Sequence, residues 1–268
     1  MGKRRFDPFV LIGLGISITA MLVAVLLHGM PLTTYADLAA FLIAIVAPFG
    51  AAFVSVPFEY VRDLPQVLRV LFTTDDVDYS ELIETLVTTA EKARREGLLS
   101  LENEIQDIPD PFLRKAIQLI VDGTDPEVVK HIMINDMEQM EIRHLLHKKF
   151  FDEWGYYGPA LGMAGALVGL IAALSGAEDR AAVTHGVAIA FIATLYAVFM
   201  SNAIVLPMAT RLDMKNQKDI LIKTLMLEGV LSIQAGDNPT LTREKLISFL
   251  PPKLKEEIIA KKEEVRRR

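Results

Sequence analysis

Four long runs of uncharged residues constrain this chain more than any other feature. Residues 8–27, 38–57, 156–175 and 183–209 contain no Asp, Glu, Lys or Arg. Each run reaches the roughly 20 residues that an α-helix needs to cross about 30 Å of hydrocarbon. Because unpaired backbone polar groups are costly in lipid, such a run is expected to be helical there. The sequence therefore predicts a polytopic membrane protein with four transmembrane helices.

The basic residues lie on one side of these runs. Of the 28 lysines and arginines, only Arg180 falls in residues 28–37 and 176–182, which join the first run to the second and the third to the fourth. Cytoplasmic loops of membrane proteins carry an excess of Lys and Arg. We therefore expect both termini, and the long segment between the second and third runs, to be cytoplasmic.

The charge distribution divides the chain into four parts. Residues 1–57 are expected to hold transmembrane helices one and two, 58–155 a cytoplasmic helical domain, 156–209 helices three and four, and 210–268 C-terminal cytoplasmic helices. The predicted fold class is all-α, with the cytoplasmic domain formed by the 2–3 loop and the C-terminal segment. Lys3 precedes an apolar stretch that is long for a signal peptide and is followed by no Ala-x-Ala site, which favours a retained first span.

Local signals predict helices in the charged parts. Asp78 suits an N-cap position, and Gly97 suits the position just after a helix C-terminus. Further helices are expected at residues 101–108, 112–121 and 240–250, with a solvated helical tail at 253–268. A helix at 125–150 is expected to run on into the third run, and one at 211–234 to continue the fourth. No stretch of useful length alternates apolar and polar residues, so no strand is expected.

Small residues form a stripe along the third run, at intervals of four, three and four. They are Gly158, Gly162, Gly165 and Gly169. A face of glycines lets another helix approach closely, although generic membrane-helix packing uses the same pattern. Pro159 and Pro207 each free a backbone carbonyl and are expected to bend their helices at similar depth, with simple kinking as the alternative.

No carboxylate lies in any of the four runs. Proteins that move ions normally need an ionisable side chain within the membrane. If this chain helps to move ions, another chain must supply that group. Thr194 and Ala166 lie at comparable distances from the cytoplasmic ends of their runs and are candidates to line the site. The alternative for Thr194 is a hydrogen bond back to its own helix.

No catalytic or metal-binding pattern is present. The chain lacks cysteine and contains no GxSxG, Walker-type or CxxC motif. Glu141 and His144 match half of a Glu-x-x-His di-metal pattern, but no second half exists. The net charge of −6 is spread over the charged segments and leaves no basic patch for nucleic acid. We expect no enzyme activity, metal, cofactor or nucleic-acid partner.

Several segments resemble hallmark segments of the MotA/PomA family, the A subunit of the flagellar stator. They are residues 93–102 (ARREGLLSLE), 227–239 (LEGVLSIQAGDNP), 248–252 (SFLPP), 158–163 (GPALGM) and 194–196 (TLY). The similarity runs from about residue 58 to residue 252. The first two spans depart from the family pattern, because the N-terminus is more basic and the second span lacks paired glycines.

This resemblance implies a homo-pentamer in the bacterial inner membrane, surrounding the single spans of two MotB-type subunits that each supply an ion-carrying aspartate. Ion flow would rotate the ring and drive the rotor protein FliG. Arg94 and Glu102 match the family's charged pair that engages FliG. Pro159 and Pro207 match prolines that shape the ion gate. The implied partners are thus the MotB-type subunit, FliG, further copies of this chain and membrane lipid.

The resemblance also bears on the coupling ion. Thr194 matches a threonine of both proton-driven and sodium-driven members, whereas sodium-driven members carry two further hydroxyls where this chain has Ala166 and Ala193. Sodium must exchange hydration water for oxygen ligands, while a proton needs the carboxylate and a route for water. The two alanines therefore predict coupling to H⁺ in preference to Na⁺.

Two other function classes stay open at this level. An ExbB/TolQ-like energiser of another envelope process also surrounds a partner helix pair, but it usually has three spans. A non-conducting membrane scaffold would move no ions. An ion-flux assay with the partner separates the scaffold from the other two classes.

Overall fold

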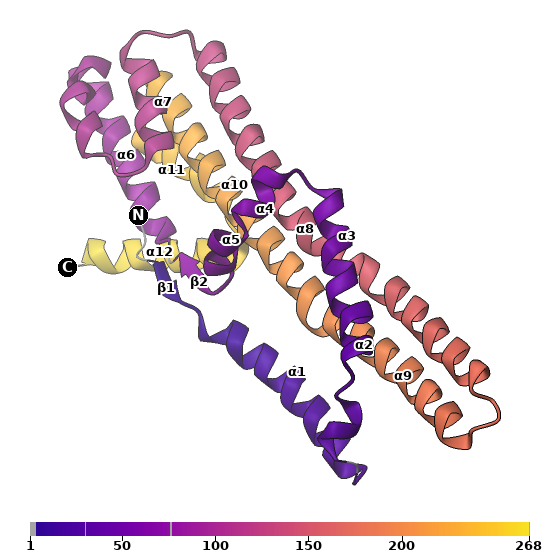
Figure 1. Ribbon diagram of the computed structural model, residues 1–268. Helices are drawn as coiled ribbons and strands as arrows, with labels where there is room; N and C mark the ends of the chain where they lie inside the picture. Colours follow the sequence, from indigo (N-terminus) through magenta and orange to yellow (C-terminus); the bar gives the residue numbers. More distant parts are fainter. Residues whose placement is uncertain (1–3, 30, 76, 268) are drawn as a thin grey trace. The chain divides into compact units, whose positions relative to one another are not determined.

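The computed structural model describes residues 4–29, 31–75 and 77–267. Lys3 and the rest of residues 1–3, which begin the first predicted part, and Arg268, which ends the last one, lie outside the described residues. Almost all of the described chain is helical, as Figure 1 shows, and this confirms the predicted all-α fold class. Within the described ranges, four helical segments are long and apolar enough to cross a membrane.

The chain forms two compact units. The first, here called the span unit, comprises Arg5–Thr74 and Arg143–Lys215. The second, here called the charged unit, comprises, among the described residues, Arg4, Asp75, residues 77–142 and residues 216–267. Residues 58–74 and 143–155 therefore pack with the four spans, although the charge pattern groups them with the cytoplasmic domain.

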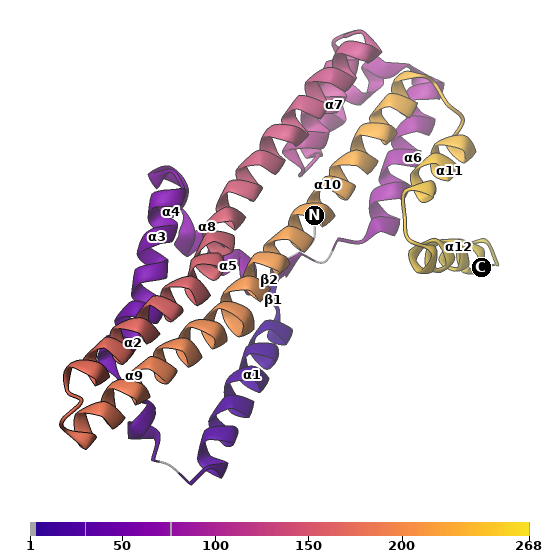
Figure 2. The same ribbon diagram turned by 90° about the vertical axis from the view of Figure 1, so that its right-hand side faces the viewer.

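The elements of the span unit are mostly apolar helices. In chain order they are β1 (Arg4–Phe6), α1 (Pro8–Leu27), η1 (Leu32–Tyr35), α2 (Leu38–Phe41), η2 (Leu42–Val46), α3 (Ala47–Ser55), α4 (Phe58–Arg62), α5 (Leu64–Leu71), β2 (Thr73–Asp75), the second part of α8 (Pro126–Ser175), α9 (Arg180–Phe199), η4 (Met200–Val205) and the first part of α10 (Leu206–Gln234). The two views of Figures 1 and 2 show α8 and α9 side by side, joined by a short turn. Asp179 begins α9 as its N-cap, accepting a hydrogen bond from the Ala181 N–H at 2.8 Å.

Among the residues whose structure is described, two stretches of π-helix interrupt the apolar helices, and each one lies just before a proline. The segment η2 precedes Pro48, and η4 precedes Pro207. A proline has no N–H and leaves the carbonyl four residues earlier without its helical donor. The wider turn redistributes these bonds: at the end of η4 the Leu206 N–H reaches the Ser201 carbonyl, five residues back. Short π-helical turns of this kind are frequent at functional sites.

A two-stranded sheet pairs β1 with β2, although no strand was predicted. Each strand has three residues, which is too short to produce a visible alternation. The Asp7 N–H extends the pairing by donating to the Phe72 carbonyl at 2.9 Å. The sheet therefore depends on partners that are distant in the sequence.

The charged unit is built from helices with clear end signals. Its elements are α6 (Tyr79–Glu96), η3 (Leu98–Asp107), α7 (Pro111–Val121), α11 (Pro239–Ser248), α12 (Pro252–Arg267) and the remaining parts of α8 and α10. Asp78 caps α6 by accepting from the Ser80 and Glu81 N–H groups at 2.9 and 3.2 Å, and Gly97 ends the helix with φ +86°. The segment expected as a helix at 101–108 is a 3₁₀-helix beginning at Leu98, because Ser100 bonds back to the Gly97 carbonyl at once.

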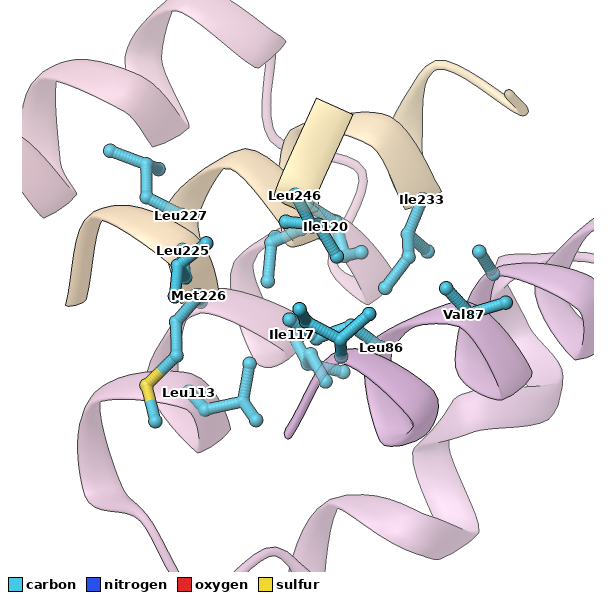
Figure 3. Close-up of a cluster of buried hydrophobic side chains, with 14 of the residues drawn as sticks. Leu86, Val87, Leu113, Ile117, Ile120, Leu225, Met226, Leu227, Ile233 and Leu246 are labelled. Atoms are coloured by element: carbon cyan, nitrogen blue, oxygen red, sulfur yellow. The ribbon is translucent and has the colours of Figure 1, made fainter. Parts of the chain in front are cut away.

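The core of the charged unit is continuous and apolar. Figure 3 shows side chains from α6, α7, α10 and α11 meeting in it. Leu86 on α6, Ile120 on α7, Leu225 on α10 and Leu246 on α11 each have at most 1% of their surface exposed. Burying side chains of this size contributes about 1.5–3 kcal/mol each. The core thus fixes the helices whose outer faces carry the charges.

Candidate functional site

The glycine face of α8 packs directly on α9 and η4. A Cβ atom on Gly169 would lie 2.6 Å from the Gly186 carbonyl oxygen and 2.7 Å from the Ala190 backbone nitrogen. Closer to the start of the third apolar run, Gly162 lies against Ala197 and Gly158 lies against Ser201. The backbones of the two helices thus approach as closely as glycine permits, and the contact lies within a single chain.

The three small residues proposed for the ion pathway have different surroundings. Ala193 is fully buried, and its Cβ lies 3.0 Å from the place where a Cβ on Gly165 would be. Thr194 and Ala166 are half-buried. The Thr194 Oγ1 donates to the Ala190 carbonyl of its own helix at 3.1 Å, which is the alternative that the sequence left open. The structure therefore places Ala193 inside the α8/α9 contact and leaves part of Thr194 and Ala166 exposed.

The two prolines lie in segments that face each other across the helix pair. Pro159 is half-buried inside α8, which continues unbroken past it, whereas Pro207 is exposed near the start of α10. Gly155, four residues before Pro159, lies against Leu206, the residue before Pro207. The turn of α8 that precedes Pro159 therefore lies against the residue next to Pro207.

Arg94 and Glu102 are exposed in the charged unit, Arg94 at the end of α6 and Glu102 in η3. Their charged neighbours are engaged within the chain: Lys92 binds Glu104, and Arg95 pairs with Glu91 at 2.5 Å. The bond to Glu104 also raises the pKa of Lys92. Within the part of the chain that the structure describes, the side chains of Arg94 and Glu102 form no ion pair. Their full charge is therefore available to a partner.

A network of charges at the start of the first span was not predicted. Asp7 accepts a hydrogen bond from the Phe9 N–H at 3.0 Å and binds the guanidinium of Arg211 with its other oxygen. The bond to Arg211 lowers the pKa of Asp7 below its usual value, so the carboxylate stays ionised. The only sequence signal was Asp7 directly before Pro8, which is a common start of a helix.

A second polar cluster missed by the sequence lies on α8 before the third span. The Nε2 atom of His147 is buried without a hydrogen-bond partner, 3.7 Å from an oxygen of Asp63. The Tyr60 ring packs edge-on to the imidazole, at 5.2 Å between centroids. Burial lowers the pKa of His147, and the attraction of Asp63 opposes this. The imidazole is therefore held mainly neutral.

The fold and this helix pair define a class of membrane proteins. The family model described as the MotA/TolQ/ExbB proton channel family matches residues 104–224. Motility protein A of Borreliella burgdorferi is 37% identical over 243 residues, covering 91% of this chain and 94% of that protein. The chain belongs to the motility protein A family and is a subunit of the flagellar stator.

Solved structures agree with this assignment. A flagellar MotAB stator complex from Bacillus subtilis contains a chain with 36% identity and a TM-score of 0.85, with 92% of this chain and 97% of that chain covered. A MotAB structure from C. jejuni also gives a TM-score of 0.85, at 28% identity, with 92% and 96% covered. The similarity therefore covers more of the chain than the sequence motifs, which run from about residue 58 to residue 252.

Proposed function

We propose that this stator subunit assembles as a ring around a single-span partner of the MotB type and converts ion flow across the inner membrane into torque on a rotor. The observation that carries the proposal is the similarity of nearly the whole chain to a flagellar MotAB stator complex. Coexpression with such a partner in a non-motile strain tests it. Rotation of tethered cells supports the proposal, and an absence of rotation despite normal membrane levels counts against it.

The charge-free spans explain why a partner is needed. None of the four runs contains Asp, Glu, Lys or Arg, so this chain has no carboxylate to carry a cation through the hydrocarbon. The acid must come from the partner's span. Imaging of the purified complex along the membrane normal counts the copies around the central helices, and we expect five copies of this chain.

The distribution of basic residues supports a cytoplasmic location for both termini and for the charged unit. The chain contains no cysteine, so single cysteines can be introduced without background. A cysteine at Ser100 in η3 should be protected from an impermeant thiol reagent in intact cells, and one at Ser175 at the end of α8 should react. The reverse pattern would contradict the proposed orientation.

The coupling ion that we propose is the proton. Ala166 and Ala193 offer no side-chain oxygen, so Thr194 supplies the one hydroxyl among these three positions. A partly dehydrated sodium ion would thus find few side-chain ligands on this chain. Rotation should continue when sodium is removed at constant membrane potential. A halt under these conditions would show that sodium is the coupling ion.

Arg94 and Glu102 are proposed to contact complementary charges on a rotor protein of the FliG type. Exposed pairs contribute about 0.2–1 kcal/mol each, so losing one weakens the contact without abolishing assembly. Arg94→Glu should therefore lower torque at normal membrane levels, and a charge reversal on the rotor should restore part of it. Lys130→Glu provides a matched control, because Lys130 is exposed on α8 of the same unit. Normal torque in Arg94→Glu would remove this residue from the rotor contact.

A further inference from the structure

The start of the first span is tied to the segment that follows Pro207. Asp7 is the N-cap of α1, and Arg211 lies four residues after Pro207 on α10, which is about one helical turn. The two side chains form an ion pair although they are 204 residues apart. Only 13% of the Asp7 side chain and 30% of the Arg211 side chain are exposed. This is a partly buried contact and not a mobile surface pair.

Each oxygen of the Asp7 carboxylate has its own partner. One oxygen accepts from the Phe9 N–H at the beginning of α1, and the other binds Arg211. The backbone N–H of Asp7 donates to the Phe72 carbonyl at 2.9 Å. One residue thus joins the first span, the segment after α5 and α10. Hydrogen bonds between ionised groups are stronger and more directional than neutral ones.

Arg211 and Lys215 also bind the end of α5. The Arg211 Nε donates to the Leu71 carbonyl at 3.0 Å, and the Lys215 Nζ donates to the Val70 carbonyl at 2.5 Å. Lys215 reaches the Thr73 carbonyl as well. The last carbonyls of a helix lack intrahelical donors and carry the negative end of its dipole. Two cations spaced one turn apart on α10 satisfy these groups.

We propose that Asp7 and Arg211 are positioning residues that hold α10, just beyond Pro207, against the start of the first span and the end of α5. This inference rests on the proposed stator function. Pro207 weakens the hydrogen bonding at the start of α10. The contact one turn later restrains the direction in which the helix leaves that point. Without the contact, α10 bends more freely at Pro207, so a movement of the spans displaces the rest of α10 less.

The inference predicts uncoupling and not simple loss of the complex. Arg211→Gln and Asp7→Asn should leave unchanged both the membrane level of the subunit and the ion leak measured when it is coexpressed with its partner. Torque per stator unit, measured from the speed steps of a bead driven by a single motor, should fall roughly two-fold or more, because a charge-assisted contact is lost. The Asn side chain still accepts from the Phe9 N–H, so the helix cap is retained. The double variant should be no worse than either single variant, as expected for residues that act through one contact.

The control is Arg69→Gln, which removes an exposed cation from the last turn of α5 in the same unit. This variant should retain normal torque. Unchanged torque in both Asp7→Asn and Arg211→Gln would overturn the inference. A parallel fall in leak, torque and membrane level would overturn it too, since that pattern indicates a purely structural role. If the unsubstituted chain gives neither leak nor torque, the proposed function itself fails, and that outcome is separate from unaffected variants of a working motor.

Discussion

Adding a single methyl group at Gly169 should separate α8 from α9. The new Cβ would lie 2.6 Å from the Gly186 carbonyl oxygen and 2.7 Å from the Ala190 nitrogen, both of which are backbone atoms. Ordinary contact begins at 3.4 Å, so the helices must move apart by about 0.8 Å, the difference between 3.4 and 2.6 Å. Overpacking of this kind costs about 1–3 kcal/mol, or roughly a 5-fold to 150-fold shift in the folding equilibrium.

The assay is equilibrium unfolding of the purified protein, with Gly169→Ala compared with Gly13→Ala. A Cβ at Gly13 on α1 meets nothing within 4 Å, so this control measures the helix propensity of alanine alone. Gly165→Ala should give an intermediate loss, because its Cβ would lie 3.0 Å from Ala193 and from the Ile43 side chain, which can shift. Equal stability of Gly169→Ala and Gly13→Ala would refute the argument that the glycine stripe sets the helix separation.

Two further predictions concern charges in the two units. Lys223 binds both oxygens of Asp110 at 2.9 and 2.8 Å with 16% and 12% of the side chains exposed, so Lys223→Met should destabilise the charged unit by about 3–5 kcal/mol in chemical unfolding. Adding Asp110→Asn should recover part of this loss, and a single variant as stable as the wild type would contradict the prediction. Burial lowers the pKa of His147 below its ordinary value of 6.5, so folding favours the neutral imidazole, and stability should decline as pH falls through the lowered pKa. Thermal unfolding at pH about 8 and about 5 should show that the melting temperature falls less in His147→Gln than in the wild type when the pH is lowered. A wild-type protein that is more stable at the lower pH would show that the attraction of Asp63 outweighs the effect of burial on the His147 pKa.

Helix ends in the charged unit could be predicted because their signals are local. The Asp78 carboxylate binds N–H groups two and three residues away, so the residue and its neighbours contain the necessary information. Gly97 adopts φ +86°, a conformation that favours glycine in any fold. The glycine stripe was also visible in the sequence, but its partner was not, because nothing local identifies α9 and η4 as the facing surface.

Features that depend on distant partners could not be predicted. The sheet of β1 and β2 and the pair of Asp7 with Arg211 join residues that are far apart in the sequence, and a single sequence carries no signal for such pairing. The different burial of the neighbouring residues Ala193 and Thr194 could not be predicted either. Ala193 and Thr194 point about 100° apart on a helix. Ala193 is therefore enclosed by the glycine face, while Thr194 is half-exposed.

The enclosure of the glycine stripe within one chain has a genetic consequence. Because the α8/α9 contact needs no second copy, we expect a substitution that separates the two helices to destabilise the single chain and to keep it out of the stator assembly. Such an allele should be recessive when a normal copy is present. An allele that alters Arg211 leaves this helix pair intact, so we expect its product to enter mixed assemblies and to lower their torque. Whether an allele is dominant or recessive thus indicates whether its substitution impairs folding of the subunit or the function of the assembled stator.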